Sequence, residues 1–186
     1  MNTTTPTLLN GLDPQAVQGL IDGITADANQ GQTHWHVHSK WRGGARSQAT
    51  IKRVEIGGQA IDRPWVIDAD EPLELGGTNT QPNPQELLLS ALNACMTVGY
   101  TALATLMGIE LESLEIETKG DIDLRGFLGI DANVKPGYDN LQYTVRIKSN
   151  GTDEQIQQIH DMVQKTSPNY FNISQPIRLD AELVCD

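Results

Sequence analysis

The sequence predicts an α+β domain, and three observations lead to this prediction. Three short segments with alternating apolar and polar side chains follow one another over residues 33–68, and a period of two is typical of β-strands. A long apolar segment with helix-start and helix-end signals follows over 84–107. A second block of strand and helix patterns then covers 111–167. Runs of strands followed by helices favour an α+β architecture with antiparallel sheets.

The N-terminal residues differ in composition from the rest of the chain. Residues 1–32 are rich in Thr, Asn, Gln and Gly. Asp13-Pro14 is typical of an N-cap and first helical position, and Val17, Leu20 and Ile24 follow at helical spacing. We therefore expect a leader over 1–32 with a short helix, and one domain over 33–186.

The first block of strands predicts an antiparallel meander. Residues 33–41 alternate throughout, which predicts one continuous strand with a buried face. Gly43-Gly44 predicts a hairpin turn into a second strand over 46–56. A third strand is expected over 60–68, because short turns between successive strands produce antiparallel neighbours.

The most informative segment is the apolar helix that follows. Asn83 is a good N-cap, Pro84 suits the first helical position and Glu86 suits the third position of a capping box. The helix is expected to run through Cys95 to Met107. Its first half is apolar on nearly all sides, which predicts a buried central helix.

The second block repeats this order. We expect strands over 111–119 and 141–149, separated by a glycine-containing excursion, and then a helix that begins after Thr152 and stops at Ser167-Pro168. Alternating apolar residues after position 176 predict a final strand. Those residues are Ile177, Leu179, Ala181 and Leu183.

Composition limits the possible functions. The net charge of −11 disfavours nucleic-acid binding, which requires a cationic surface. The first Lys or Arg is Lys40, so no basic signal-peptide segment is present, and no apolar run approaches the roughly 18 residues of a transmembrane helix. We expect a soluble, cytoplasmic protein without membrane contact. The apolar content of 38% is lean for a single core, and this favours a homodimer.

Several motifs together resemble those of the OsmC/Ohr family, the osmotically induced and organic-hydroperoxide-resistance proteins. The matching segments keep their order over roughly 33–184, and they are Gly76-Gly77 with Pro82 to Cys95, Asp121 to Gly129, Lys135 to Tyr138, and Thr166-Ser167-Pro168. The resemblance implies an intertwined homodimer in which antiparallel sheets surround buried central helices. It also implies reduction of organic hydroperoxides by two cysteines at a site between the subunits.

One departure from the family pattern concerns the second cysteine. Ser167 stands where the family usually has the resolving cysteine before proline. A two-cysteine peroxidase condenses a sulfenic acid with a second thiol, and a hydroxyl group cannot do this. The sequence therefore predicts a single reactive cysteine whose sulfenic acid is resolved by an external thiol.

The resemblance also assigns the other candidate residues. It implies that Cys95 is the reactive thiol and that an arginine of the 42–46 turn stabilises its thiolate, Arg46 in preference to Arg42. Glu86 lies close to the family position of a carboxylate that orients this arginine. Nine residues separate Glu86 from Cys95, about 13 Å of helix rise, so Glu86 could act only through the arginine, and helix capping is the competing role.

Two further groups of residues could take part in chemistry. His34, His36 and His38 alternate on one expected strand, where imidazoles could hold a metal, but an exposed polar face is the simpler interpretation, and we expect neither a metal nor a cofactor. Cys185 is the penultimate residue, and it is either a surplus surface thiol or a substitute resolving thiol.

Two hypotheses for function follow. The first is thiol-dependent, peroxiredoxin-like reduction of organic hydroperoxides through Cys95, in oxidative-stress defence. The alternative is a protein of the same fold that has no catalytic activity and binds a small apolar ligand at the dimer interface.

Overall fold

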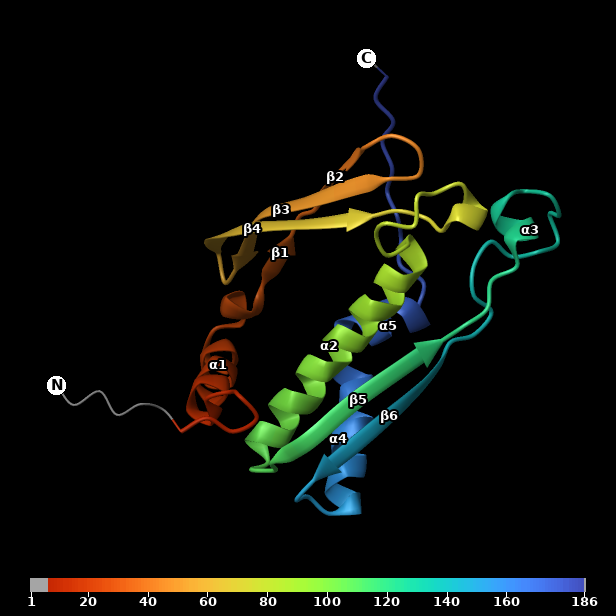
Figure 1. The fold of residues 1–186 in the computed structure, drawn as a ribbon. Coiled ribbons are helices and arrows are strands. Elements are labelled where there is room, and N and C mark those ends of the chain that lie inside the picture. Colours follow the sequence, from red (N-terminus) through yellow and green to blue (C-terminus); the bar gives the residue numbers. More distant parts are fainter. Residues whose placement is uncertain (1–6, 186) are drawn as a thin grey trace. The chain divides into compact units, whose positions relative to one another are not determined.

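The computed structural model describes residues 7–185, which divide into two compact units with a boundary between Ser90 and Ala91. The boundary falls inside one helix, α2 (Pro84–Leu106). Helices and antiparallel sheets occur in both halves of the chain, so the predicted α+β class is confirmed (Figure 1). Each unit is described separately below.

The first unit begins with the expected short helix. Helix α1 (Pro14–Ala26) starts after Asp13, whose carboxylate accepts a hydrogen bond from the Gln15 N–H at 2.9 Å. A 3-10 turn, η1 (Ala28–Gly31), follows and leads into the sheet. The helix predicted within the leader is therefore present; the division of the chain at residue 32 stays a prediction.

The sheet of the first unit is an antiparallel meander, but its first strand is divided in two. Strands β1 (Thr33–Trp35) and β2 (His38–Trp41) both pair with β3 (Ser47–Ile56), which pairs with β4 (Gln59–Ala69). Trp35 lies opposite Val54, whereas His38 lies opposite Thr50. The chain advances three residues from Trp35 to His38 but four residues between Thr50 and Val54 of β3. The prediction of one continuous strand over 33–41 was therefore wrong, because β3 carries an extra residue at a bulge.

A tight turn joins the sheet to α2 and explains the paired glycines. Gly76 has φ +81°, and a Cβ on Gly77 would lie 1.8 Å from the carbonyl oxygen of Glu71. The buried Asp70 carboxylate accepts hydrogen bonds from the N–H and hydroxyl groups of Thr78 and Thr80, at 2.6–3.2 Å. These donors hold the pKa of Asp70 well below its ordinary value. The turn is thereby fixed just before the helix.

Helix α2 begins at the predicted capping box. The Asn83 side-chain oxygen accepts from the Glu86 N–H at 2.8 Å, and the Glu86 carboxylate accepts from the Asn83 N–H at 2.8 Å. The pattern Asn-x-x-Glu thus satisfies two of the backbone donors that a helix leaves without partners. Gly108, with φ +69°, follows the last turn as expected.

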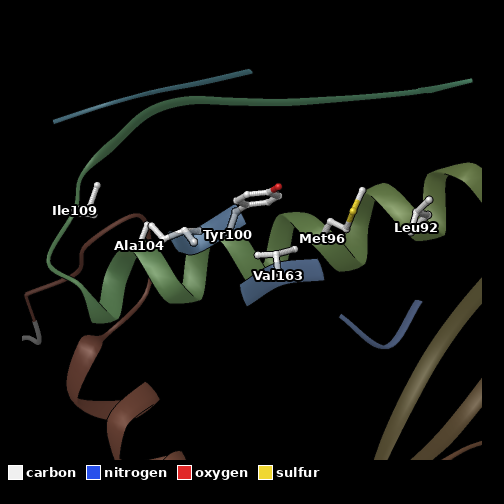
Figure 2. Close-up of a cluster of buried hydrophobic side chains, with 7 residues drawn as sticks. Leu92, Met96, Tyr100, Ala104, Ile109 and Val163 are labelled. Atoms are coloured by element: carbon white, nitrogen blue, oxygen red, sulfur yellow. The ribbon is translucent and has the colours of Figure 1, made fainter. Parts of the chain in front are cut away.

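One face of α2 forms the core of the second unit. Leu92, Met96, Tyr100 and Ala104 are buried at a spacing of four residues, and Val163 packs beside them (Figure 2). The first half of the helix is less buried than expected, since Leu88 is 41% exposed. By length and hydropathy α2 could span a membrane, which the sequence analysis did not anticipate, but the core helix of a globular domain has the same properties.

A two-stranded sheet and a second helix complete this core. Strands β5 (Leu111–Lys119) and β6 (Gln142–Ser149) form an antiparallel pair, with the short helix α3 (Leu124–Phe127) between them. Helix α4 (Asp153–Thr166) starts at a Thr152 capping box and buries Ile159 and Val163. Gly99 permits close approach of α4, because a Cβ there would meet Val163 Cγ2 at 3.2 Å.

The end of the chain differs from the prediction. Pro168 does not simply end α4 but starts another helix, α5 (Pro168–Ser174). Residues 175–185 form no strand, and Leu179 and Leu183 are 87% and 88% exposed. The predicted final strand was wrong for the described residues, because an alternating segment forms a strand only where another strand supplies hydrogen bonds.

Candidate functional site

Cys95 lies on α2 beside the core of the second unit. It is half-buried, whereas Met96 on the next position is fully buried. Because a helix turns by about 100° per residue, the thiol points to the edge of the apolar face rather than into its centre. The sulfur is thus neither fully exposed nor sealed in the core.

Ser167 contacts this sulfur directly. Its hydroxyl group donates a hydrogen bond to Cys95 Sγ over 3.3 Å, although 72 positions separate the two residues in the sequence. Ser167 is only 5% exposed, and it ends α4 and caps α5, where its Oγ also accepts from the Tyr170 N–H at 3.3 Å. Ser167 and Cys95 are therefore brought together by the fold, while the assignment of Ser167 to the second-site position stays a prediction.

Two asparagines hold the backbone around the thiol. Asn169 Nδ2 donates to the carbonyl oxygen of Ala91 at 2.8 Å, and in an α-helix this carbonyl also accepts the N–H of Cys95. Asn93 joins α2 to β5, donating to the Ile116 carbonyl at 3.2 Å and accepting from the Thr118 hydroxyl at 2.5 Å. The sequence analysis missed both asparagines. Asn93 is close to Cys95 in the sequence and Asn169 is close to Ser167, and this closeness was the signal that could have identified them.

The two arginine candidates lie in the hairpin of the first unit. The Arg42 N–H donates to the Arg46 carbonyl at 2.9 Å, and the Arg46 guanidinium donates to the Arg42 carbonyl at 3.3 Å across Gly43-Gly44. Both glycines have positive φ, +92° and +57°, as the predicted turn requires. Because Cys95 belongs to the second unit, its pairing with Arg46 stays a prediction.

Glu86 has a structural partner of its own. Its carboxylate belongs to the α2 capping box with Asn83. The capping role that competed with the catalytic one is therefore present, and any action of Glu86 through an arginine stays a prediction.

A partly buried polar cluster lies farther along α2 and was not anticipated. The Tyr100 hydroxyl contacts His160 Nδ1 at 2.5 Å, and the Gln164 amide contacts His160 Nε2 at 3.0 Å and the Tyr143 hydroxyl at 2.6 Å. Burial raises the pKa of Tyr100, which keeps it a neutral phenol. This cluster joins α2, β6 and α4 through partly buried hydrogen bonds beside the core.

The remaining candidates do not form a site within the described part of the chain. Residues 7–185 contain no group of three or more His, Cys, Asp or Glu side chains arranged to hold a metal. His34 and His38 lie on separate strands and His36 lies between them. Cys185 is exposed and, like Cys95, is a free thiol.

The fold and this arrangement define a class of protein, an α+β domain with a thiol on its long core helix and a hydroxyl donor beside the sulfur. The model of the OsmC-like protein family matches residues 77–182, more than half of the chain, and the chain belongs to this family. A curated relative, the uncharacterized protein YmaD of Bacillus subtilis (strain 168), is 24% identical over 91 residues. That match covers 49% of this chain and 55% of the relative, so the chain spans about half the length of the curated relative.

Solved structures agree on the fold. An OsmC-like protein from Mycoplasma pneumoniae matches with a TM-score of 0.59 and 18% identity, over 76% of this chain and 87% of its own. A putative osmotic stress induced and detoxification response protein from Psychrobacter arcticus 273-4 matches with a TM-score of 0.57 and 16% identity, over 75% and 88% of the two chains. These similarities establish the OsmC-like fold.

Proposed function

We propose that this protein reduces organic hydroperoxides through the single thiol of Cys95, as part of peroxide defence. The observation that carries the proposal is the hydrogen bond from Ser167 to Cys95 Sγ at 3.3 Å, in a chain of the OsmC-like family. The family supplies the substrate class. The hydrogen bond marks this cysteine as a sulfur in a polar setting, since a thiol that only fills a core has no need of a donor.

The first chemical step is attack of the Cys95 thiolate on the distal oxygen of the hydroperoxide. The S–O bond forms as the O–O bond breaks, and the alkoxide leaves and takes a proton to become the alcohol. Sulfur loses two electrons and becomes a sulfenic acid, while the peroxide gains them. The reaction needs no metal or organic cofactor.

The Ser167 hydroxyl has two consequences for this chemistry. A hydrogen bond to an ionised acceptor is about twice as strong as one between neutral groups, so the hydroxyl favours the thiolate over the thiol. The same hydroxyl cannot form a disulfide. An external thiol must then condense with the sulfenic acid and release water, and a second one must reduce the mixed disulfide to restore Cys95.

Arg46 is the proposed cation for the thiolate and for the departing alkoxide. A cation beside sulfur raises the thiolate fraction and hence the nucleophilicity at neutral pH. Arg46→Ala is expected to lower the rate of Cys95 alkylation at pH 7 in a Cys185→Ser background. If Arg42→Ala has this effect and Arg46→Ala does not, the role belongs to Arg42.

A homodimer is the proposed functional unit. One face of the first sheet exposes large apolar side chains, with Trp41 76% and Trp65 56% exposed, and an uncovered surface of this kind normally meets another protein. The unpaired residues 175–185 also lack a strand partner in the described chain. A folded monomer at micromolar concentration in sedimentation equilibrium would contradict this. We also propose a cytoplasmic location, because free thiols stay reduced in the cytoplasm.

The test of function is turnover of tert-butyl hydroperoxide with dithiothreitol and with monothiol donors. Wild type is compared with Cys95→Ser, and Cys185→Ser serves as the matched control. We expect turnover in wild type and in Cys185→Ser and none above background in Cys95→Ser.

The rival function is binding of a small apolar ligand without catalysis. A hollow of about 360 Å³ between Leu103 and Met107 of α2 and Ile159 and Met162 of α4 is large enough for such a ligand. Equal rates in all three proteins would reject the peroxidase and leave this function in its place.

A further inference from the structure

The positive charge of this acidic chain is unevenly distributed. The 16 residues from His38 to Arg53 contain five of the 13 Lys and Arg residues and none of the 24 Asp and Glu residues. Within the described residues, every ion pair joins groups of the second unit, between positions 112 and 180. The Lys and Arg side chains of the β2–β3 hairpin therefore form no ion pair within the described part of the chain.

Strand pairing gathers three of these five cations, Lys40, Arg42 and Lys52, on one face of the sheet. His38 lies opposite Thr50 and Lys40 lies opposite Gln48, and side chains directly opposite one another project on the same side. Together with Arg42 and Lys52 they line a groove of about 210 Å³. The strands that carry it, β2 and β3, run beside one another in Figure 1.

The exposed tryptophans Trp41 and Trp65 project to the opposite face of the sheet, whereas Val66, which lies opposite Thr50, is on the groove side. Trp41 lies opposite Ser47, and Ile51 lies opposite Trp65, whereas Lys40 and Gln48 point the other way because successive side chains of a strand alternate. The face that carries the two exposed tryptophans is therefore not the one that carries the groove. A partner on the face of the tryptophans would leave the groove open to solvent.

Hydrogen bonds organise the floor of the groove. The Arg42 guanidinium donates to the Gln48 side-chain oxygen, and the Gln48 amide donates to Asp68 of β4 at 3.0 Å. Asp68 offsets one positive charge of the three on Lys40, Arg42 and Lys52, and the groove stays cationic. Gln48 thus holds the Arg42 guanidinium in place at one end of the groove.

From this geometry we infer that the β2–β3 groove is a binding site for a small oxyanion, a phosphate or carboxylate group of a metabolite. Lys40, Arg42 and Lys52 line a space smaller than the roughly 300 Å³ of the smallest drug-sized pockets, which suits an anionic head group. The overall charge of −11 repels anions, so any anion binding must arise from local structure. The inference does not depend on the peroxidase function.

The test is a titration of the full chain with inorganic phosphate, followed by amide NMR at pH 7 and constant ionic strength. A second titration uses succinate, and a third uses chloride. We expect saturable shifts confined to residues 38–42 and 48–52 with phosphate or succinate. Whichever of phosphate and succinate binds more tightly identifies the head group that the groove prefers.

Charge variants check the location. The Lys40→Gln/Lys52→Gln double variant should weaken binding by about tenfold or more, because it removes two of the charge-assisted donors. Lys119→Gln removes an exposed strand lysine of the second unit and should leave the affinity unchanged. Absent or non-saturating shifts, an equal response to chloride, or an equal loss in Lys119→Gln would overturn the inference.

Discussion

Replacing Ser167 by cysteine should convert the site into one that closes a disulfide. The Ser167 hydroxyl lies 3.3 Å from Cys95 Sγ, whereas two bonded sulfurs lie about 2.05 Å apart. The longer C–S bond covers part of the difference, and small rotamer adjustments cover the rest. In a Cys185→Ser background, one equivalent of tert-butyl hydroperoxide should remove two hydrogens from Ser167→Cys and link positions 95 and 167.

The cross-link should also stabilise the fold. It would close a loop of 72 positions, for which the chain-entropy model gives about 4 kcal/mol. The gain is measured as the difference in the free energy of unfolding in urea between the oxidised and the dithiothreitol-reduced variant. Strain in the disulfide would make the measured gain smaller. Gain of one oxygen without a cross-link, in a variant that folds, would refute the argument that Ser167 occupies the second-site position.

Three further predictions concern Tyr100, Glu86 and Asp70. Tyr100→Phe should lower the free energy of unfolding by about 1–3 kcal/mol in urea, because His160 loses its buried partner. Glu86→Gln should keep α2 stable and Glu86→Ala should cost about 1 kcal/mol, since glutamine also serves in a capping box with Asn83; loss of turnover in Glu86→Gln with unchanged stability would instead show that the carboxylate acts in catalysis. The Asp70 pKa is lowered from 3.8, so its contribution to stability is present above the ordinary pKa and is lost as the pH falls towards the lowered one. Asp70→Asn should therefore be less stable than wild type at pH 7, with a gap that narrows below about pH 4; a gap independent of pH would contradict this.

Local signals in the sequence were sufficient for the start of α2 and for the β2–β3 turn. Asn83, Glu86 and Gly43-Gly44 act through neighbouring backbone groups, so their roles can be predicted without knowing the rest of the fold. The link between Cys95 and Ser167 is different in kind, because 72 positions separate them. It could be anticipated only because a family pattern records which distant segments meet.

The failures have a common physical origin in contacts that the local pattern does not encode. The bulge that divides the first strand depends on pairing between β3 and its neighbours. The segment after residue 175 alternates as a strand does, but it has no partner within the described chain. Asn169 lies beyond the predicted end of the helix at Ser167-Pro168, and its contact with Ala91 depends on α5, which the local pattern does not encode.

The most direct test of the proposed function is intact mass spectrometry of Cys185→Ser after one equivalent of tert-butyl hydroperoxide. The proposal predicts gain of one oxygen on Cys95, reversal by an added thiol, and further oxidation to the sulfinic state when excess peroxide acts without thiol. A Cys95 that remains an unmodified thiol, under conditions that oxidise a model thiol of equal concentration, would contradict it.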